Sequence, residues 1–126
     1  MIFIVDDDEA IRASLRLLPE CEGLEVREFA SCQEFLDADR GGIDGCLILD
    51  IRMPGENGLE LLEIMHRDGS TLPVIIVSGR LDAETSVRAR AFGVRALVEK
   101  PYGAGQILSP VRAALDPTLV RAGDAC

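Results

Sequence analysis

The chain has 126 residues, 48% of them hydrophobic and 28% charged, which is typical of one soluble globular domain. Its formal net charge of −9 disfavours binding to nucleic acid or to an anionic membrane surface, because both require clustered Lys and Arg. No apolar run approaches the length of a membrane-spanning helix. The N-terminus lacks the basic segment of a signal peptide, so we expect a cytoplasmic protein.

The first half of the chain alternates strand and helix. Residues 2–5 are uniformly apolar and predict a buried strand, which four acidic residues follow at 6–9. A helix comes next, because apolar residues recur at helical spacing; Asp7 or Asp8 could cap it, and Pro19 should end or kink it. Residues 24–29 alternate apolar and polar side chains, as an edge strand does.

A capping-box pattern at Ser31 and Glu34 predicts a short helix after the edge strand. Residues 46–49 then form another apolar run, which predicts a buried strand ending at Asp50. A loop is expected over residues 53–58, and the helix after it should close at Gly69.

The remaining elements follow the same alternation. Residues 72–77 predict a strand that ends in Ser78, and Asp82 can cap the helix after it. A last short strand over 96–98 leads into Lys100, and a final helix is expected over 104–115. Within that helix Pro110 could introduce a kink or delay the start.

Five strands joined by helices, most of them uninterrupted apolar runs, predict an α/β fold, a doubly wound parallel sheet covered on both faces. Right-handed crossovers place the carboxyl ends of parallel strands along one edge, where ligands bind in such folds. That edge should collect the polar residues that follow the strands: Asp6, Asp7, Asp50, Ser78 and Lys100.

These residue types favour phosphoryl transfer to a carboxylate. Three carboxylates in one pocket repel one another unless a cation joins them, and Mg²⁺ prefers oxygen ligands of this kind. Asp50 would be the nucleophile, Lys100 would hold a phosphoryl oxygen, and the Ser78 hydroxyl would donate to another. Taken alone, Asp50 could equally cap the turn that follows it.

Four motifs occur together in the order and spacing of a known family. The chain resembles the receiver domain of a two-component response regulator, and the residue sequence of its motifs is most similar to the FixJ-type subgroup. The motifs cover about residues 2–115, and they are Val5-Asp6-Asp7, Leu49-Asp50-Ile51-Arg52-Met53-Pro54 with Gly58, Val77-Ser78-Gly79 and Glu99-Lys100-Pro101-Tyr102.

The resemblance implies a flavodoxin-like fold over residues 1–115, with sheet order 2-1-3-4-5, and a tail or linker over 116–126. It implies that Asp50 accepts a phosphoryl group from the phosphohistidine of a sensor histidine kinase. Asp7 and Asp50 would bind Mg²⁺, Arg52 would contribute its backbone carbonyl, and Asp6 would act directly or through water. The peptide bond between Lys100 and Pro101 is expected to be cis.

The resemblance also implies a signalling role and not enzymatic turnover, with slow self-dephosphorylation as the reset. It allows homodimer formation on phosphorylation, and a DNA-binding output domain in the parent protein or in a partner. The family couples the hydroxyl at Ser78 to an aromatic residue three positions before the lysine. Here that position is Leu97, so the usual switch is altered, and Tyr102 is interpreted as a packing residue.

Two other functions remain open from the sequence. An aspartate-nucleophile phosphatase would use a second acid two residues after the nucleophile, where this chain has Arg52. A phosphorylation-independent interaction module would not need the full set of acids, hydroxyl and lysine.

Overall fold

The computed structural model describes residues 1–21, 23–38, 45–53, 56–100 and 102–115. Its centre is a parallel five-stranded sheet in the order β2-β1-β3-β6-β7. The predicted order 2-1-3-4-5, counted over these five strands, is confirmed. The strands are β1 (Ile2–Val5), β2 (Val26–Phe29), β3 (Cys46–Asp50), β6 (Val74–Ser78) and β7 (Ala96–Glu99).

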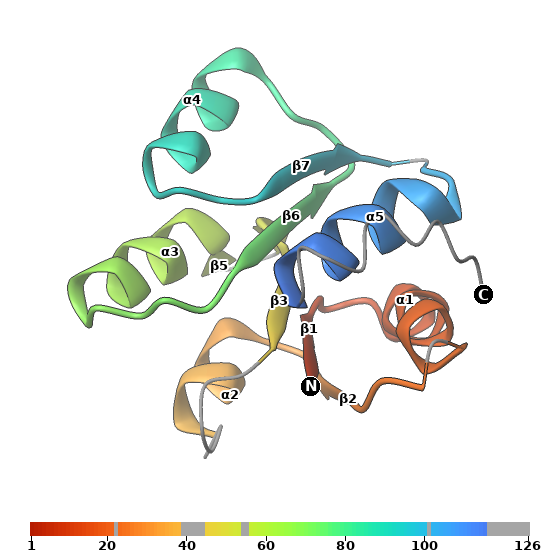
Figure 1. Cartoon of the computed structure of the whole chain (residues 1–126). Helices are drawn as coiled ribbons and strands as arrows, with labels where there is room; N and C mark the ends of the chain where they lie inside the picture. The colour runs from red at the N-terminus through yellow and green to blue at the C-terminus, as the bar shows by residue number, and fades with distance from the viewer. Residues whose placement is uncertain (22, 39–44, 54–55, 101, 116–126) are drawn as a thin grey trace.

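Helices cover both faces of this sheet. In Figure 1, α1 and α5 lie on one side of the strands, and α2, α3 and α4 lie on the other. Right-handed crossovers account for this arrangement, because α1 joins β1 to β2 in one direction along the sheet, whereas α2, α3 and α4 join strands in the other direction. The helices are α1 (Glu9–Cys21), α2 (Cys32–Asp37), α3 (Gly58–Arg67), α4 (Ala83–Ala91) and α5 (Ala104–Leu115).

The three central strands are apolar on both faces because each face has its own core. Along β1, Phe3 and Val5 pack with α2, α3 and α4, whereas Ile2 and Ile4 pack with α1 and α5. The same alternation continues along β3 and β6. This explains why uninterrupted apolar runs, and not alternating ones, mark these strands in the sequence.

Side-chain caps define the starts of α1, α2 and α4. The side chain of Asp8 accepts hydrogen bonds from the backbone N–H groups of Ala10 and Ile11, so Asp8, and not Asp7, caps α1. Ser31 and Asp82 accept from the N–H groups three residues on and cap α2 and α4, as predicted.

Pro19 and Pro110 both lie inside helices and do not end or delay them. The first helix continues past Pro19 to Cys21, so the expectation that Pro19 could end it is wrong. The last helix begins at Ala104 and contains Pro110 in its interior, so Pro110 does not delay its start. Packing of apolar side chains on one face stabilises α5 although the proline removes a backbone donor.

A short antiparallel pairing lies where the sequence predicted only a loop. Strands β4 (Arg52–Met53) and β5 (Glu56–Asn57) pair with each other beyond the carboxyl end of β3. The pairing folds the chain back toward β3, so that α3 starts beside Ile51. Two-residue strands carry no periodicity, and for that reason no pattern predicted them.

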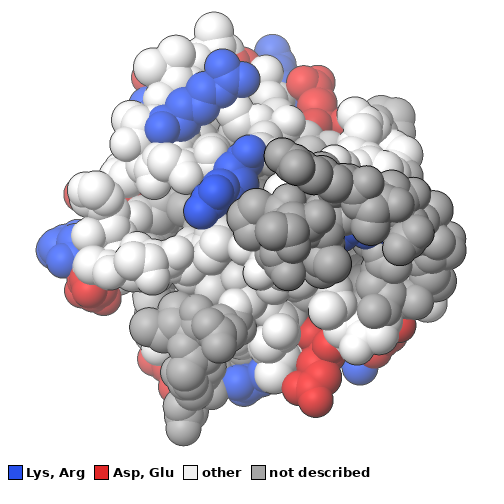
Figure 2. Space-filling view, in the orientation of Figure 1, with Lys and Arg blue, Asp and Glu red and all other residues white. Residues whose placement is uncertain are grey.

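The surface agrees with the charge and hydropathy of the sequence. On the face shown in Figure 2, the Lys and Arg side chains stand apart or beside acidic ones. Among the described residues, no helix is long and apolar enough to cross a membrane. The predicted tail over residues 116–126 lies outside the described residues.

Burial raises the pKa of Cys46 to about 12, which is consistent with a packed core thiol.

Candidate functional site

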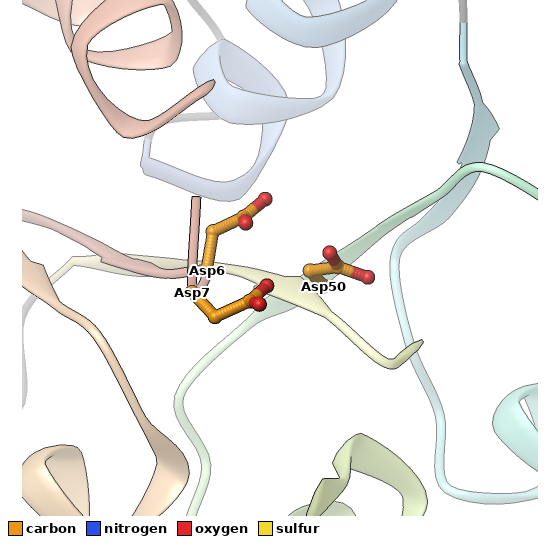
Figure 3. Close-up of side chains that lie close together, drawn as sticks. All are labelled: Asp6, Asp7 and Asp50. Carbon is orange, nitrogen blue, oxygen red and sulfur yellow. The ribbon is translucent and has the colours of Figure 1, made fainter. Parts of the chain in front are cut away.

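Three carboxylates meet at the carboxyl edge of the sheet. Asp6 and Asp7 directly follow β1, and Asp50 is the last residue of β3, the strand paired with β1. One oxygen from each carboxylate lies within 4.8 Å of the others. Figure 3 shows the side chains of Asp6 and Asp7 reaching from the end of β1 toward Asp50. The sequence predicted this convergence from the strand ends alone.

Lys100 supplies a positive charge to the carboxylates. Its Nζ atom lies 3.5 Å from Oδ2 of Asp6 and 3.5 Å from Oδ2 of Asp50. The backbone N–H of Lys100 donates to the carbonyl of Ser78, which fixes the end of β7 against the end of β6. The side chain therefore reaches the acids from a strand two places away from β3 in the sheet.

Asp6 is the most enclosed of the three acids. It is 1% exposed, its Oδ1 accepts from the N–H of Asp8, and its Oδ2 accepts from Lys100. Burial raises the pKa of Asp6, and the nearby charge of Asp50 adds to the increase. The hydrogen bond from Asp8 and the charge of Lys100 oppose the rise without cancelling it.

The solvent-exposed member of the cluster is Asp7. Asp7 is exposed to solvent, and Asp50 lies within reach of it from a buried position. Hard oxygen donors at this spacing, with an open side toward solvent, suit a divalent cation such as Mg²⁺ that keeps part of its water shell. The donor set therefore fits the predicted metal.

Ser78 lies at the end of β6, next to the acids but turned toward its own loop. Val77 pairs with Asp50, so Ser78 stands one residue beyond that pair. The Ser78 hydroxyl donates to the carbonyl of Arg80 at 3.1 Å and accepts from the N–H of Arg80 at 3.3 Å. The hydroxyl must give up its bond to Arg80 before it can donate to a group on Asp50.

A glycine allows the chain to pass close to the end of β3. Gly58 is buried at the start of α3, and its N–H donates to the carbonyl of Ile51. A Cβ atom at Gly58 would lie 2.6 Å from the Cα of Ile51, which is closer than atoms can pack. Gly58 thus lets α3 start against the residue that follows Asp50.

Comparison with known proteins bears directly on this site. The family model of the response regulator receiver domain matches residues 2–112 of the chain. This chain belongs to the response regulator receiver family. The family and the FixJ-like character inferred from the motifs are therefore confirmed.

Two curated relatives of this receiver domain are named transcriptional regulatory proteins. FixJ of Azorhizobium caulinodans is 40% identical over 114 residues, which are 90% of this chain and 54% of the relative. TdiR of Thauera aromatica is 39% identical over 114 residues, or 90% of this chain and 50% of the relative. The chain spans about half the length of the curated relatives it matches.

Solved structures show the same fold. The response regulator StyR superposes with a TM-score of 0.84 at 33% identity, over 96% of this chain and 61% of that one. The structure of FixJ-N has a TM-score of 0.77 at 30% identity, over 91% and 92% of the two chains.

Leu97 and Tyr102 lie on opposite sides of this receiver domain. Leu97 pairs with Ile76 in the sheet and packs, partly buried, against the core shared with α3 and α4. Tyr102 packs against the core beneath α1 and α5. Burial raises the pKa of Tyr102, and the charge of Asp6 adds to the increase. Tyr102 therefore fills the role of a packing residue and does not occupy the place of Leu97.

Two predicted site residues are described in part or not at all. Arg52 belongs to β4, directly after the buried Ile51, but its side chain is not among those described. The expected cis bond involves Pro101, which lies outside the described residues.

Sequence reasoning missed the residue that contacts the backbone of the acidic segment. Arg12, on α1, donates from Nη1 to the carbonyl oxygen of Asp6 at 2.7 Å. A single arginine on a helix carries no distinguishing pattern. The feature that could have identified Arg12 was its position, one helical turn after the acidic residues and on the side of α1 that faces β2.

Proposed function

We propose that this receiver domain is a phosphorylation-dependent switch in which Asp50 accepts a phosphoryl group from the phosphohistidine of a sensor histidine kinase. The arrangement of Asp50 and Lys100 carries this proposal, because an acceptor carboxylate and a cation for the incoming phosphoryl oxygens lie 3.5 Å apart. Membership of the receiver family supports it independently.

The cation expected at this site is Mg²⁺, which neutralises phosphoryl oxygens as charge develops on them. Asp7 and Asp50 would bind it through carboxylate oxygens, and Arg52 would add its backbone carbonyl. Asp6 would act directly or through a water molecule, since its carboxylate belongs to the same cluster and its oxygens also accept hydrogen bonds from Asp8 and Lys100.

In the transfer step, a carboxylate oxygen of Asp50 attacks phosphorus as the bond between phosphorus and the donor histidine nitrogen breaks. The imidazole leaves as the new acyl phosphate forms. Lys100 pairs with one phosphoryl oxygen, and the Ser78 hydroxyl turns from Arg80 toward another. Water later attacks the phosphorus, the bond between phosphorus and the Asp50 oxygen breaks, and inorganic phosphate leaves as the carboxylate is restored. This slow self-dephosphorylation resets the switch.

The output proposed for the phosphorylated domain is control of transcription, since the similar FixJ and TdiR are transcriptional regulatory proteins. The effector would be a DNA-binding domain in the parent protein or in a partner, reached directly or through a homodimer of phosphorylated domains. A cytoplasmic location fits a kinase partner of this kind.

The phosphoacceptor assignment is tested with Mg²⁺ and a small acyl-phosphate donor such as acetyl phosphate. We expect a phosphoryl adduct by intact-protein mass spectrometry, lost in Asp50→Asn, absent with a chelator and removed by hydroxylamine. Asp68→Asn, at an exposed acid beyond α3, is the matched control and should still form the adduct. An adduct that persists in Asp50→Asn would reject the assignment.

A second measurement tests whether Leu97 takes part in the switch. In methyl-labelled protein, the Leu97 signals should shift on phosphorylation, together with signals from α4 residues packed on the same core. The methyl signals of Leu15, in the core under α1, are the internal reference. Unchanged Leu97 signals in fully phosphorylated protein would exclude output through this face.

A further inference from the structure

Arg12 ties three elements together next to the acidic cluster. From α1, its Nη1 atom donates to the carbonyl oxygen of Asp6 at 2.7 Å, and its Nε atom lies 3.2 Å from Oε1 of Glu28 on β2. The side chain is 15% exposed. A planar guanidinium held from two directions has a fixed orientation, unlike a solvated surface arginine.

The carbonyl that Arg12 contacts belongs to the peptide between Asp6 and Asp7. Because a peptide unit is planar, the bond that holds this carbonyl also fixes the direction in which the backbone enters Asp7. The Asp6 carboxylate is anchored separately by Asp8 and Lys100. The backbone of Asp7 therefore runs between two restrained peptides, the one whose carbonyl Arg12 contacts and the one whose N–H, from Asp8, bonds to the Asp6 carboxylate.

Glu28 balances the charge of this arrangement. Its carboxylate pairs with Arg12 through one oxygen and with Arg16 through the other, and Arg16 also pairs with Glu20. The positive charge of Arg12 is therefore compensated on the side away from Asp6. Arg16 lies on the same helix and shares the same glutamate, but it pairs with Glu20 and Glu28 and not with the backbone of Asp6.

We infer that Arg12 is a positioning residue for the cation site, and that it holds the peptide between Asp6 and Asp7 so that Asp7 faces Asp50 before a cation arrives. This inference rests on the function proposed above. A restrained ligand loses less conformational freedom on binding than a free one, and groups that orient metal ligands typically change affinity by about 10–100-fold when removed.

The test is a Mn²⁺ titration followed by the electron paramagnetic resonance signal of free Mn²⁺, which requires no phosphorylation. In Arg12→Gln the affinity should fall about tenfold. Arg16→Gln, which loses a pairing with Glu28 but no contact with Asp6, should bind Mn²⁺ as the wild type does. Arg12→Lys should stay weak, because an ammonium group cannot reproduce the two-sided guanidinium contact.

Thermal unfolding without metal separates positioning from general stability. The inference predicts that Arg12→Gln and Arg16→Gln differ in Mn²⁺ affinity even at temperatures where both are fully folded. Equal losses of affinity in the two variants, or wild-type affinity in Arg12→Gln, would overturn the positioning role and leave the proposed function standing. Failure of the wild type to bind Mn²⁺, or binding that survives in Asp7→Asn and Asp50→Asn, would overturn both.

Discussion

The Nζ atom of Lys100 lies 3.5 Å from Oδ2 of Asp50, although β6 separates their strands in the sheet. The same ammonium group lies 3.5 Å from Oδ2 of Asp6. Lys100 is thus a cation that compensates two buried carboxylates. It occupies the position of a counter-ion, and a divalent cation at the same acids would compete with it electrostatically.

Replacement of Lys100 by methionine should therefore move metal binding and phosphorylation in opposite directions. Loss of a positive charge beside the acids should tighten Mg²⁺ binding roughly tenfold, whereas loss of a phosphoryl-oxygen partner should slow adduct formation by about 100-fold. Calorimetric Mg²⁺ titration and timed mass spectrometry with acetyl phosphate measure the two effects.

The control for Lys100→Met is Arg95→Met. Arg95 is exposed at the opposite end of β7, where its N–H bonds to Val74, and its removal changes the net charge of the protein by the same amount. It should leave both rates and affinities near the wild type. Weaker Mg²⁺ binding in Lys100→Met would show that the lysine does not act as the counter-ion.

The raised pKa of Asp6 predicts how stability depends on pH without metal. Burial favours the protonated carboxyl, so the folded protein binds more protons than the unfolded chain between the usual and the raised pKa. Stability should consequently fall as the pH rises through this interval, and the ionised Asp6 should destabilise the apo protein at neutral pH.

Asp6→Asn should accordingly raise the melting temperature at pH 7.5 in the presence of a chelator. The gain should vanish at acidic pH, below the usual pKa of Asp, where the carboxyl is protonated in both states. Differential scanning calorimetry across pH measures the difference, with Asp68→Asn at an exposed site as the control. A gain that is constant with pH would mean that desolvation of Asp6 is not its cause.

The close approach of Gly58 to Ile51 predicts a specific sensitivity next to Asp50. Gly58→Ala places a methyl group 2.6 Å from the Cα of Ile51, and a backbone atom cannot move aside cheaply. We expect a loss of about 1–3 kcal/mol in the free energy of unfolding, measured in urea, together with weaker Mg²⁺ binding because Ile51 adjoins Asp50.

Gly105→Ala is the matched control for Gly58. A Cβ atom at Gly105 meets no heavy atom within 4 Å, and the residue lies inside α5, where alanine is the better helix former. This variant should be more stable by roughly 0.5–1 kcal/mol. Equal effects at the two glycines would mean that helix propensity, and not the contact with Ile51, governs position 58.

The positions at which the apolar strands end were enough to predict the fold and most of the site residues. The features that the sequence did not predict have physical reasons. Apolar runs located β1, β3, β6 and β7, and parallel topology then required Asp6, Asp50 and Lys100 to meet at one edge. The β4–β5 pairing is too short to have a period. The contact of Arg12 with the Asp6 carbonyl joins a side chain to a backbone group. Because every residue has a backbone carbonyl, no residue pattern in the sequence identifies this partner.

Pro110 is the clearest conflict between sequence and structure, and it gives the last prediction. Proline lacks the N–H that would donate to the carbonyl of Gln106, four residues earlier in α5, and its ring crowds that carbonyl. Burial of Ile107 and Val111 keeps the helix formed in spite of this cost.

Pro110→Ala should therefore increase the free energy of unfolding by about 1–3 kcal/mol. A smaller opposing effect reduces this gain, because the unfolded chain without the proline has more conformational entropy. Ser109→Ala, at an exposed neighbouring position of the same helix, should change it by much less. Urea unfolding of the three proteins measures the difference. If Pro110→Ala is no more stable than the wild type, a local bend of α5 accommodates the proline, and the missing hydrogen bond causes no net loss in the free energy of unfolding.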